Sequence, residues 1–326
     1  MKMRAAVVGL GIGKAHAAVY AERADVELVG LVDTVPERLR QAAEATPAPT
    51  FGDLDAMLAA AKPDIVSIAT PPHLHYPQAK ACIEAGAHVL VEKPLAATAI
   101  ECETLARLGE EGGRVLMVAQ KKRFIEPNRF LKEKVSGEWG PVKAASALYW
   151  LGRVELDWFW DDGQGGGPLV ENSVHMIDIL RHLIGDVETV YAAGGNLFME
   201  HRRPVPDLAC ATLKFRSGAV ASLALGYGSE WNFASESLYL ATDKATAHMT
   251  GPFDRPNLLR WSMRGSGRTE SREFNPNGFP EEIDAFLKAV RGESANPVPA
   301  SDAAKSIAVC LAIKDSLKTG KPVEMG

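Results

Sequence analysis

The chain has 326 residues, of which 46% are hydrophobic and 24% charged; this profile indicates a globular protein of about two domains and excludes a mostly disordered or fibrous one. Its 41 Asp and Glu residues outnumber its 36 Lys and Arg residues, for a net charge of −5, so we expect no nucleic acid and no membrane surface as a partner. No apolar run approaches the ~20 residues that a membrane-spanning helix needs, and no signal-peptide pattern stands at the start.

The four cysteines, at positions 82, 102, 210 and 310, are far apart in the sequence and form no Cys-x-x-Cys pair. We therefore expect reduced, mostly buried thiols and a cytoplasmic protein rather than a disulfide framework. No base stands beside any of these thiols, which argues against a catalytic cysteine. The eight histidines show no metal-ligand spacing, so we expect no metal site.

Strands and helices alternate along the first 120 residues. The predicted strands are short and almost wholly apolar: Lys2–Gly9, Val26–Asp33, Asp64–Ala69, His88–Glu92 and Val115–Ala119. The predicted helices between them are Ala15–Arg23, Pro36–Ala45, Asp53–Ala61, Tyr76–Ala85 and Thr98–Glu111. Apolar strands that alternate with helices are typical of a parallel sheet covered on both faces. We expect a doubly wound, Rossmann-type domain over residues 1–120.

The pattern changes after residue 120. A helix is predicted over Glu171–Ile184, and the later chain predicts strands at Leu208–Arg216, Ala219–Tyr227, Ser237–Thr242, Thr246–Thr250 and Leu258–Met263, a loop at Arg264–Asn277, and helices at Pro280–Val290 and Ser301–Thr319. Ser217-Gly218 predicts a hairpin between the first two strands. We expect a second, α+β domain over residues 121–326 with a mostly antiparallel sheet, and the helix near 301–319 packing back near the first domain. The fold class is therefore α/β with two domains.

A glycine-rich loop, Gly9–Gly13, directly follows the first strand and opens the first helix. Its expected cofactor-binding residues are Gly9, Gly11, Ile12 and Gly13. Such a loop lets the backbone approach a pyrophosphate, which the helix N-terminus attracts. The third glycine comes one position early, so the loop is shorter than usual by one residue. The alternative is a strand–helix turn that binds no ligand.

Asp33 ends the second strand, 20 residues after Gly13. A carboxylate there accepts hydrogen bonds from a ribose 2′-OH and repels a 2′-phosphate. No Arg directly follows it, so we expect NAD rather than NADP as the cofactor.

Two further segments stand at the carboxyl ends of predicted strands, where open α/β sheets bind ligands: 70–75, which contains Thr70, Pro71 and His75, and Glu92-Lys93-Pro94. Together with Gly9–Gly13, the segment 165–178 and the ending 316–323, they resemble the Gfo/Idh/MocA oxidoreductase family along nearly the whole chain. The resemblance implies an NAD-binding Rossmann domain and a C-terminal domain with an open sheet, through which family members commonly form dimers or tetramers. It also implies cofactor contacts from Thr70, Pro71, His75, Glu92, Lys93 and Gln120.

Hydride transfer from an alcohol needs a general base and a group that stabilises the developing alkoxide. Lys93 suits the second role, and the resemblance assigns it a catalytic role beside the cofactor. His175 is the candidate base. At helical spacing Glu171, His175 and Asp178 share a face, where a carboxylate fixes the imidazole tautomer. The family usually has Asp, an amide or a small residue in place of Glu171.

Three residues are candidates for contact with a polyhydroxylated substrate: Lys121, Trp160 and Asp178. The family commonly has Asn where Lys121 stands, and a lysine suits an anionic or hydroxyl-rich ligand. The alternative is a solvated pair with Lys122. Trp160, just before the glycine run, suits stacking on a sugar ring, whereas we expect Tyr149 and Trp150 to be core residues.

The function that we expect is hydride transfer between NAD and a carbon of a sugar, cyclitol or related polyol. An NAD-binding regulator without turnover is one alternative, although it would need neither Lys93 nor His175. Glycoside cleavage with tightly held NAD is another, because some relatives oxidise a sugar carbon transiently.

Overall fold

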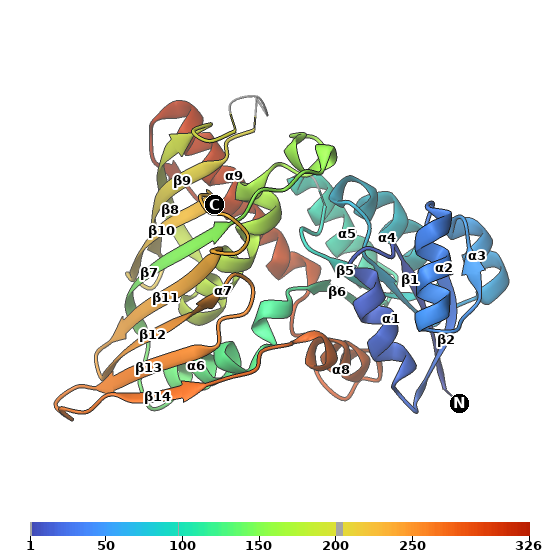
Figure 1. Cartoon of the computed structure of the whole chain (residues 1–326), viewed down its shortest axis with the longest axis horizontal. Coiled ribbons are helices and arrows are strands. Elements are labelled where there is room, and N and C mark those ends of the chain that lie inside the picture. Colours follow the sequence, from blue (N-terminus) through green and yellow to red (C-terminus); the bar gives the residue numbers. More distant parts are fainter. Residues whose placement is uncertain (1, 97, 200–204) are drawn as a thin grey trace. The chain divides into compact units, whose positions relative to one another are not determined.

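A computed structural model of the chain describes residues 2–96, 98–199 and 205–326. The chain folds into two compact units (Figure 1). The first comprises the residues up to Gln120 together with Phe279–Ala304, and the second comprises Lys121–Gly278 together with Lys305–Gly326. The structure thus groups Phe279–Ala304 with the first unit, whereas the sequence analysis assigned that segment to the second domain.

The first unit contains a parallel sheet of six strands in the order β3-β2-β1-β4-β5-β6. Its strands are β1 (Met3–Val8), β2 (Val26–Val32), β3 (Thr50–Phe51), β4 (Ile65–Ile68), β5 (His88–Glu92) and β6 (Leu116–Ala119). Its helices are α1 (Gly13–Ala21), α2 (Pro36–Ala45), α3 (Leu54–Ala61), α4 (His75–Glu84), α5 (Ala99–Glu111) and α8 (Phe279–Val290). β1, β4, β5 and β6 are buried over most or all of their length, as a sheet covered on both faces requires.

Polar residues define where several of these helices begin. Asp53 accepts a hydrogen bond from the amide of Ala56 at 2.8 Å, and Thr98 forms a reciprocal capping pair with Glu101. Pro36 is the first residue of α2, where its missing N–H has no partner to lose. These local signals explain why the sequence predicted the helices of this unit to within two residues.

The segment Phe279–Ala304 is held in the first unit by ion pairs and by a backbone hydrogen bond. Asp284 of α8 pairs with Arg23 at 3.3 Å, and Arg291 pairs with Asp25 at 2.5 Å. Farther along, the amide of Val118 in β6 donates to the carbonyl of Val298 at 3.0 Å. Such pairings between distant segments leave no local sequence signal, so the sequence analysis missed them.

The second unit is built on a nine-stranded sheet in the order β14-β13-β12-β11-β7-β10-β9-β8-β15. The strands are β7 (Val142–Leu151), β8 (Val187–Gly195), β9 (Leu208–Phe215), β10 (Val220–Tyr227), β11 (Ser235–Thr242), β12 (Ala245–Pro252), β13 (Leu258–Met263), β14 (Glu270–Glu273) and β15 (Val323–Glu324). The helices are α6 (Glu126–Ser136), α7 (Val174–Ile184) and the part of α9 (Ala300–Thr319) from residue 305 onward. Neighbouring strands are antiparallel except β7 and β10, which confirms the predicted fold class.

Several elements of this unit were absent from the sequence prediction or differ from it. The sequence analysis predicted no element over α6, β7 or β8, and β14 lies inside the predicted loop Arg264–Asn277. All four residues of β14 are exposed, so this edge strand has no apolar pattern to reveal it. The predicted helix Glu171–Ile184 is wrong at its start, because Pro168–Asn172 forms a single wide turn and α7 begins at Val174.

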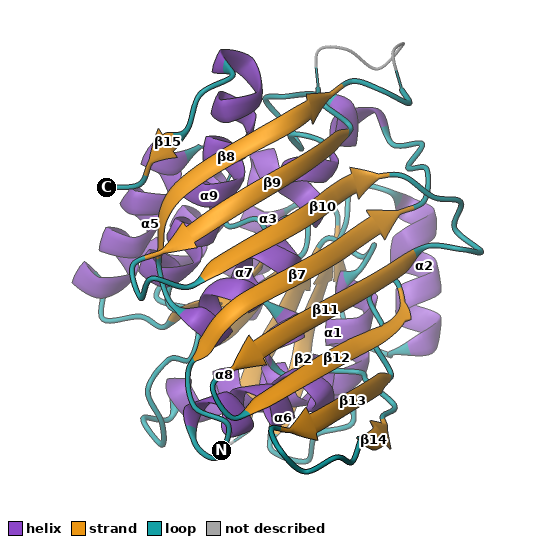
Figure 2. Ribbon diagram, turned by 90° about the vertical axis from the view of Figure 1, so that its left-hand side faces the viewer, coloured by secondary structure: helices purple, strands orange, loops and turns teal. Residues whose placement is uncertain are grey.

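One face of the second sheet is not covered by any helix in the described part of the chain, and Figure 2 looks onto it. Burial alternates along β9, so that Ala209, Ala211, Leu213 and Phe215 are buried, whereas Cys210, Thr212 and Lys214 are exposed. Along β9 the uncovered face therefore carries two small side chains and one lysine. In the residues that the structure describes, no helix is long and apolar enough to cross a membrane.

Candidate functional site

The first candidate region is the edge of the parallel sheet at which its strands end. Because all six strands run the same way, the loops that follow β1, β2, β4, β5 and β6 share this edge. They carry the candidate cofactor residues, namely Gly9–Gly13, Asp33, Thr70 with Pro71, Glu92 with Lys93, and Gln120.

Gly9 and Gly13 of the first loop are required for different reasons, whereas Gly11 is not sterically constrained. Gly9 has φ +86°, and a Cβ there would lie 2.6 Å from the carbonyl oxygen of Ala69. At Gly13, the first residue of α1, a Cβ would lie 2.9 Å from Val7, so this glycine lets the helix pack closely on β1. A Cβ at Gly11 would have no neighbour within 4 Å, and Ile12 is 49% exposed. The tip of the loop is therefore open to a ligand, and the residues present fit a pyrophosphate beside the N-terminus of α1.

Asp33 lies under this loop and is 7% exposed. Its carboxylate accepts hydrogen bonds from the amides of Leu10 at 2.8 Å and Val35 at 2.9 Å. It therefore orients the glycine loop, and its contact with a ribose remains a prediction. The sequence analysis found no Arg directly after Asp33, but Arg38 of α2 reaches the carboxylate at 3.8 Å.

Glu92 at the end of β5 is also held in place. Its Oε1 lies 3.3 Å from Nε2 of His16 in α1, and its Oε2 accepts a hydrogen bond from the amide of Lys93 at 3.2 Å. The ring of His16 in turn packs edge-on against Phe279. This pair connects the helix of the glycine loop to the strand end that carries Lys93, whose side chain is half-buried.

His75 has a different role from the predicted direct contact with the cofactor. It is fully buried, and its ring nitrogens lie 2.8 Å from the carbonyl oxygens of Thr70 and of Pro94. Burial lowers the pKa of His75, although the two carbonyl groups oppose that shift. In this position the side chain cannot touch a ligand, and it instead connects the loops that follow β4 and β5.

Thr70, Pro71 and Gln120 lie beside these anchors. Thr70 donates its hydroxyl to Gln78 at 2.7 Å, and both Thr70 and Pro71 are half-buried. Gln120 is 1% exposed, and its buried side-chain oxygen has no hydrogen-bond partner among the described residues. These positions remain predicted cofactor contacts.

The second candidate region is a cluster of charged side chains in the second unit. Nζ of Lys121 lies 2.6 Å from Oδ2 of Asp254. Lys122 is 2% exposed, pairs with the buried Glu236, and lies 3.7 Å from Oδ1 of Asp254 and 4.9 Å from the centre of the Tyr149 ring. The alternative of two solvated lysines is therefore wrong, because both ammonium groups are paired with carboxylates.

His175 and Glu171 act electrostatically on members of this cluster. Burial alone would raise the pKa of Asp254, but Lys122, Lys121 and His175 together hold it well below its usual range. Burial raises the pKa of Tyr149 well above its usual value, and the carboxylates of Glu236, Asp254 and Glu171 add to that effect. Near neutral pH Asp254 is therefore ionised and Tyr149 keeps its proton.

Glu171, His175 and Asp178 do not share one helix face. Glu171 lies in the wide turn before α7, so the helical spacing that the sequence analysis used does not apply to it. His175 lies in the first turns of α7 and is 9% exposed. Glu171 is half-buried.

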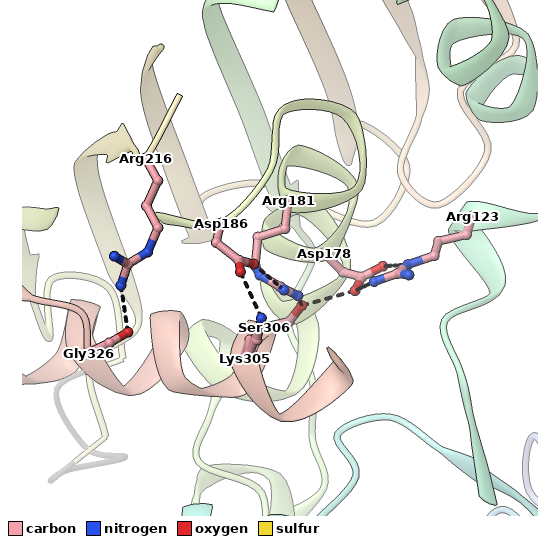
Figure 3. A network of polar contacts seen from close by, with 8 residues as sticks. All are labelled: Arg123, Asp178, Arg181, Asp186, Arg216, Lys305, Ser306 and Gly326. Atoms are coloured by element: carbon pink, nitrogen blue, oxygen red, sulfur yellow. Dashed lines mark hydrogen bonds and ion pairs between the residues drawn. The ribbon is translucent and has the colours of Figure 1, made fainter. Parts of the chain in front are cut away.

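Asp178 is a structural residue rather than a substrate contact. It is 1% exposed and accepts two hydrogen bonds from Arg123, at 2.6 and 2.7 Å, and one from Ser306 at 3.0 Å. Figure 3 shows how this network continues from Ser306 to Arg181, and from there to Asp186. The prediction of a substrate role is wrong because every oxygen of this carboxylate is used to join α7 to the segment after β6 and to α9.

Trp160 also belongs to the core. It is 5% exposed, packs in a cluster with Leu151, Phe159 and Met199, and donates its indole N–H to the carbonyl of Val154 at 2.7 Å. The expected contact with a sugar ring is therefore not supported. Tyr149 is fully buried, as expected.

Sequence reasoning missed five residues that the structure brings to these two regions: His16, Arg38, Lys122, Glu236 and Asp254. One signal stood in the sequence, because His16 follows the glycine loop closely on the first helix. Arg38 is close in sequence to its partner Asp33. Lys122, Glu236 and Asp254 contact residues far away along the chain, as in the Lys121–Asp254 pair, whose members are 133 positions apart. No spacing rule connects such positions.

Comparisons with known proteins agree with this organisation. Residues 3–120 match the model described as "Oxidoreductase family, NAD-binding Rossmann fold", and residues 129–248 match the GFO/IDH/MocA C-terminal domain. D-glucoside 3-dehydrogenase of Escherichia coli is 29% identical, over 99% of this chain and 97% of the relative. D-xylose 1-dehydrogenase (NADP(+)) 2 of Haloferax volcanii is 26% identical over 97% of each chain. The crystal structure of the WlbA dehydrogenase from Bordetella pertussis in complex with NADH and UDP-GlcNAcA has a TM-score of 0.85 and 27% identity, covering 100% of this chain and 99% of that one.

Because Asp178 has a structural role, its substitution should lower the stability of the protein. Asp178→Asn removes the carboxylate that pairs with the buried Arg123, so the free energy of unfolding should fall by ~3–5 kcal/mol. Glu188→Gln breaks the Lys214–Glu188 pair, whose side chains are 56% and 39% exposed, and should cost ~0–1 kcal/mol. Urea denaturation of both variants measures the difference. Unchanged stability of Asp178→Asn together with lost activity would restore a substrate role for Asp178.

Proposed function

We propose, since the chain belongs to the Gfo/Idh/MocA family of oxidoreductases, that it transfers a hydride between NAD and a hydroxyl-bearing carbon of a sugar, cyclitol or related polyol. The observation that carries the proposal is the open glycine loop, whose tip at Gly11 leaves room for a ligand and whose position is held by Asp33. Named relatives of the chain are dehydrogenases of sugars, which supports the substrate class.

In this proposal the backbone of Gly9–Gly13 and the N-terminus of α1 hold the pyrophosphate, and Asp33 accepts the ribose hydroxyls. The nicotinamide, when bound, accepts or supplies the hydride. Lys93 stabilises the negative charge that develops on the substrate oxygen, and Glu92, fixed by His16, keeps the backbone of Lys93 in place. Glu92 thus contributes to catalysis by positioning Lys93.

His175 takes the hydroxyl proton in the direction of oxidation. Its neighbours in the second unit suit that task, because Asp254 is a carboxylate that stays ionised and can stabilise an imidazolium. Glu171, in the turn before α7, contributes a further carboxylate to the surroundings. Return of the same proton serves the reverse reaction.

Lys93 and His175 should be required for turnover but not for the fold. Lys93→Ala and His175→Ala should lower kcat by ~10²–10⁴-fold, whereas Tm and NAD affinity should change little. Lys93→Arg keeps the charge but cannot give up its proton, so its activity separates charge stabilisation from proton relay. Steady-state kinetics with calorimetric NAD titration measures both effects. A near-normal kcat of His175→Ala would show that the base is elsewhere.

NAD should bind more tightly than NADP, because the carboxylate of Asp33 repels a 2′-phosphate. Arg38 is 54% exposed, so Arg38→Ala should widen the ratio of the two Kd values only about two- to fivefold. Asp33→Asn should reduce the ratio of the Kd for NADP to the Kd for NAD about tenfold. This ratio is informative even if the loop loosens and both affinities fall. Isothermal titration with both cofactors tests this. Tighter binding of NADP to the unaltered protein would overturn the cofactor assignment.

We also propose that the uncovered face of the second sheet is an interface between copies of this chain, in a dimer or tetramer. The small side chains of this face, such as Cys210 and Thr212, allow close packing of a second sheet. Thr212→Arg should disrupt the interface, and Asp243→Arg, in an exposed turn, is its control. Light scattering at micromolar concentration reports the mass. A monomeric wild-type protein would contradict the proposal.

A cytoplasmic location accords with four cysteines that are all free thiols.

The regulator and glycoside-cleaving alternatives are separated from the main proposal by net NADH formation. The test uses a panel of polyols and their methyl glycosides. Stoichiometric NADH supports the dehydrogenase, sugar release without net NADH supports glycoside cleavage, and binding without either supports the regulator.

A further inference from the structure

We infer that Asp254 makes the substrate site of this enzyme selective for neutral polyols over anionic ones, such as sugars that carry a carboxylate or phosphate group. This inference rests on the proposed function and extends it to the charge of the substrate. Asp254 is a specificity-determining residue in this view. The sequence alone left open whether Lys121 contacts an anionic or a hydroxyl-rich ligand.

The two lysines that would attract an anion are already neutralised within the second unit. Lys121 is bonded to Oδ2 of Asp254 at 2.6 Å, and Lys122 lies 3.7 Å from Oδ1 of the same carboxylate. Lys122 also pairs with Glu236. Two ammonium groups thus meet two carboxylates, those of Asp254 and Glu236. The cluster therefore offers no net positive charge to an incoming anion.

The exposure of the side chains determines which of these charges a ligand meets. The side chain of Asp254 is 33% exposed and that of Lys121 is 14% exposed, whereas Lys122 and Glu236 are 2% and 1% exposed. Asp254 is thus the most exposed side chain of this network, although its Oδ1 is buried and its Oδ2 bonds Lys121. Sugar hydroxyls donate hydrogen bonds to a carboxylate, but a carboxylate or phosphate on the ligand is repelled by it.

The backbone holds Asp254 in this position. It has φ +64°, in the left-handed region that few residues other than glycine adopt, and Asp and Asn tolerate that conformation best. Its amide donates to Oε2 of Glu236 at 2.8 Å, which fixes the turn after β12. Asn at this position would keep both the shape and the backbone geometry, so a change of charge can be tested without a change of fold.

The proposed base acts electrostatically on the cluster. His175 is one of the groups that keep the pKa of Asp254 low, so the two side chains are within electrostatic range of each other. A substrate that gives its proton to His175 must therefore approach the field of Asp254. This proximity links the cluster to the reacting end of the substrate rather than to a remote surface.

The test compares pairs of ligands that share a ring and differ in one group, which is neutral in one member and anionic in the other: methyl β-D-glucopyranoside against methyl β-D-glucuronide, and myo-inositol against myo-inositol 1-phosphate. Binding to the NAD complex is measured by calorimetry for the wild type, for Asp254→Asn, and for Asp243→Asn. The control changes the net charge of the chain equally, but Asp243 is exposed and its nearest ionic partner, Lys143, lies 3.7 Å away outside the cluster.

The wild type should bind the neutral member of at least one pair more tightly than the anionic member. Asp254→Asn should reduce that ratio about tenfold, since removing one close charge is worth roughly one pKa unit, and Asp243→Asn should leave it unchanged. Lys121→Gln should raise the ratio, because it removes a positive charge and keeps Asp254. Because the two variants are expected to change the ratio in opposite directions, a general loss of folding cannot explain both changes.

Three results would overturn the inference: tighter binding of both anionic ligands by the wild type, an unchanged ratio in Asp254→Asn, or no binding of any neutral polyol. NADH formation is recorded in the same samples. Preferential binding of neutral ligands without NADH formation would count against the proposed hydride transfer and leave the charge selectivity standing. The two claims therefore fail separately.

Discussion

Parallel strands that end at one edge of a sheet are the constraint on which the cofactor region depends. Each loop at that edge brings one kind of group: Gly9–Gly13 an open backbone, Asp33 a carboxylate, and Glu92-Lys93 a charged pair. The groups are then fixed by contacts between loops as well as within them. Asp33 holds the amide of Leu10, and His75 connects two further loops through their carbonyl groups. Binding residues on such loops gain precision from the rigid sheet below them.

Three consecutive cations organise the second unit in a comparable way. Lys121, Lys122 and Arg123 pair with Asp254, Glu236 and Asp178, which lie in three different parts of that unit. The Arg123–Asp178 pair is structural and the Lys122–Glu236 pair is buried. Of these six side chains, Asp254 and Lys121 are the most exposed. Burying a charge is unfavourable unless it is paired, so these contacts determine how the elements pack. They also determine the electrostatic field that remains at the site.

The sequence predicted the first unit well because its signals are local. Asp53 and Thr98 mark helix starts, and Gly9–Gly13 stands directly between a strand and a helix. The second unit depends on pairing over long distances. β7, a central strand, contains four alanine and serine residues among its ten and gives no strong strand signal. Its partners β10 and β11 come much later in the chain.

The residues of the candidate site also differ in whether they could be predicted from the sequence. Asp33, Lys93 and His175 could be proposed from their positions after strands and within a helix, whereas Asp254 could not be, because nothing near it in the sequence indicates a ligand. Asp178 and Trp160 were misassigned because residue spacing does not show which neighbour a side chain meets. Asp178 meets Arg123, and the indole of Trp160 meets a backbone carbonyl.

Isotope transfer tests the central claim, hydride transfer between a polyol carbon and NAD, most directly. The NAD complex is incubated with polyols that carry deuterium on their hydroxyl-bearing carbons, and the cofactor is recovered for mass spectrometry. The account predicts reduced cofactor that carries one deuterium on the nicotinamide ring. Reduced cofactor without deuterium, or bound polyol with no reduction of NAD, would contradict it.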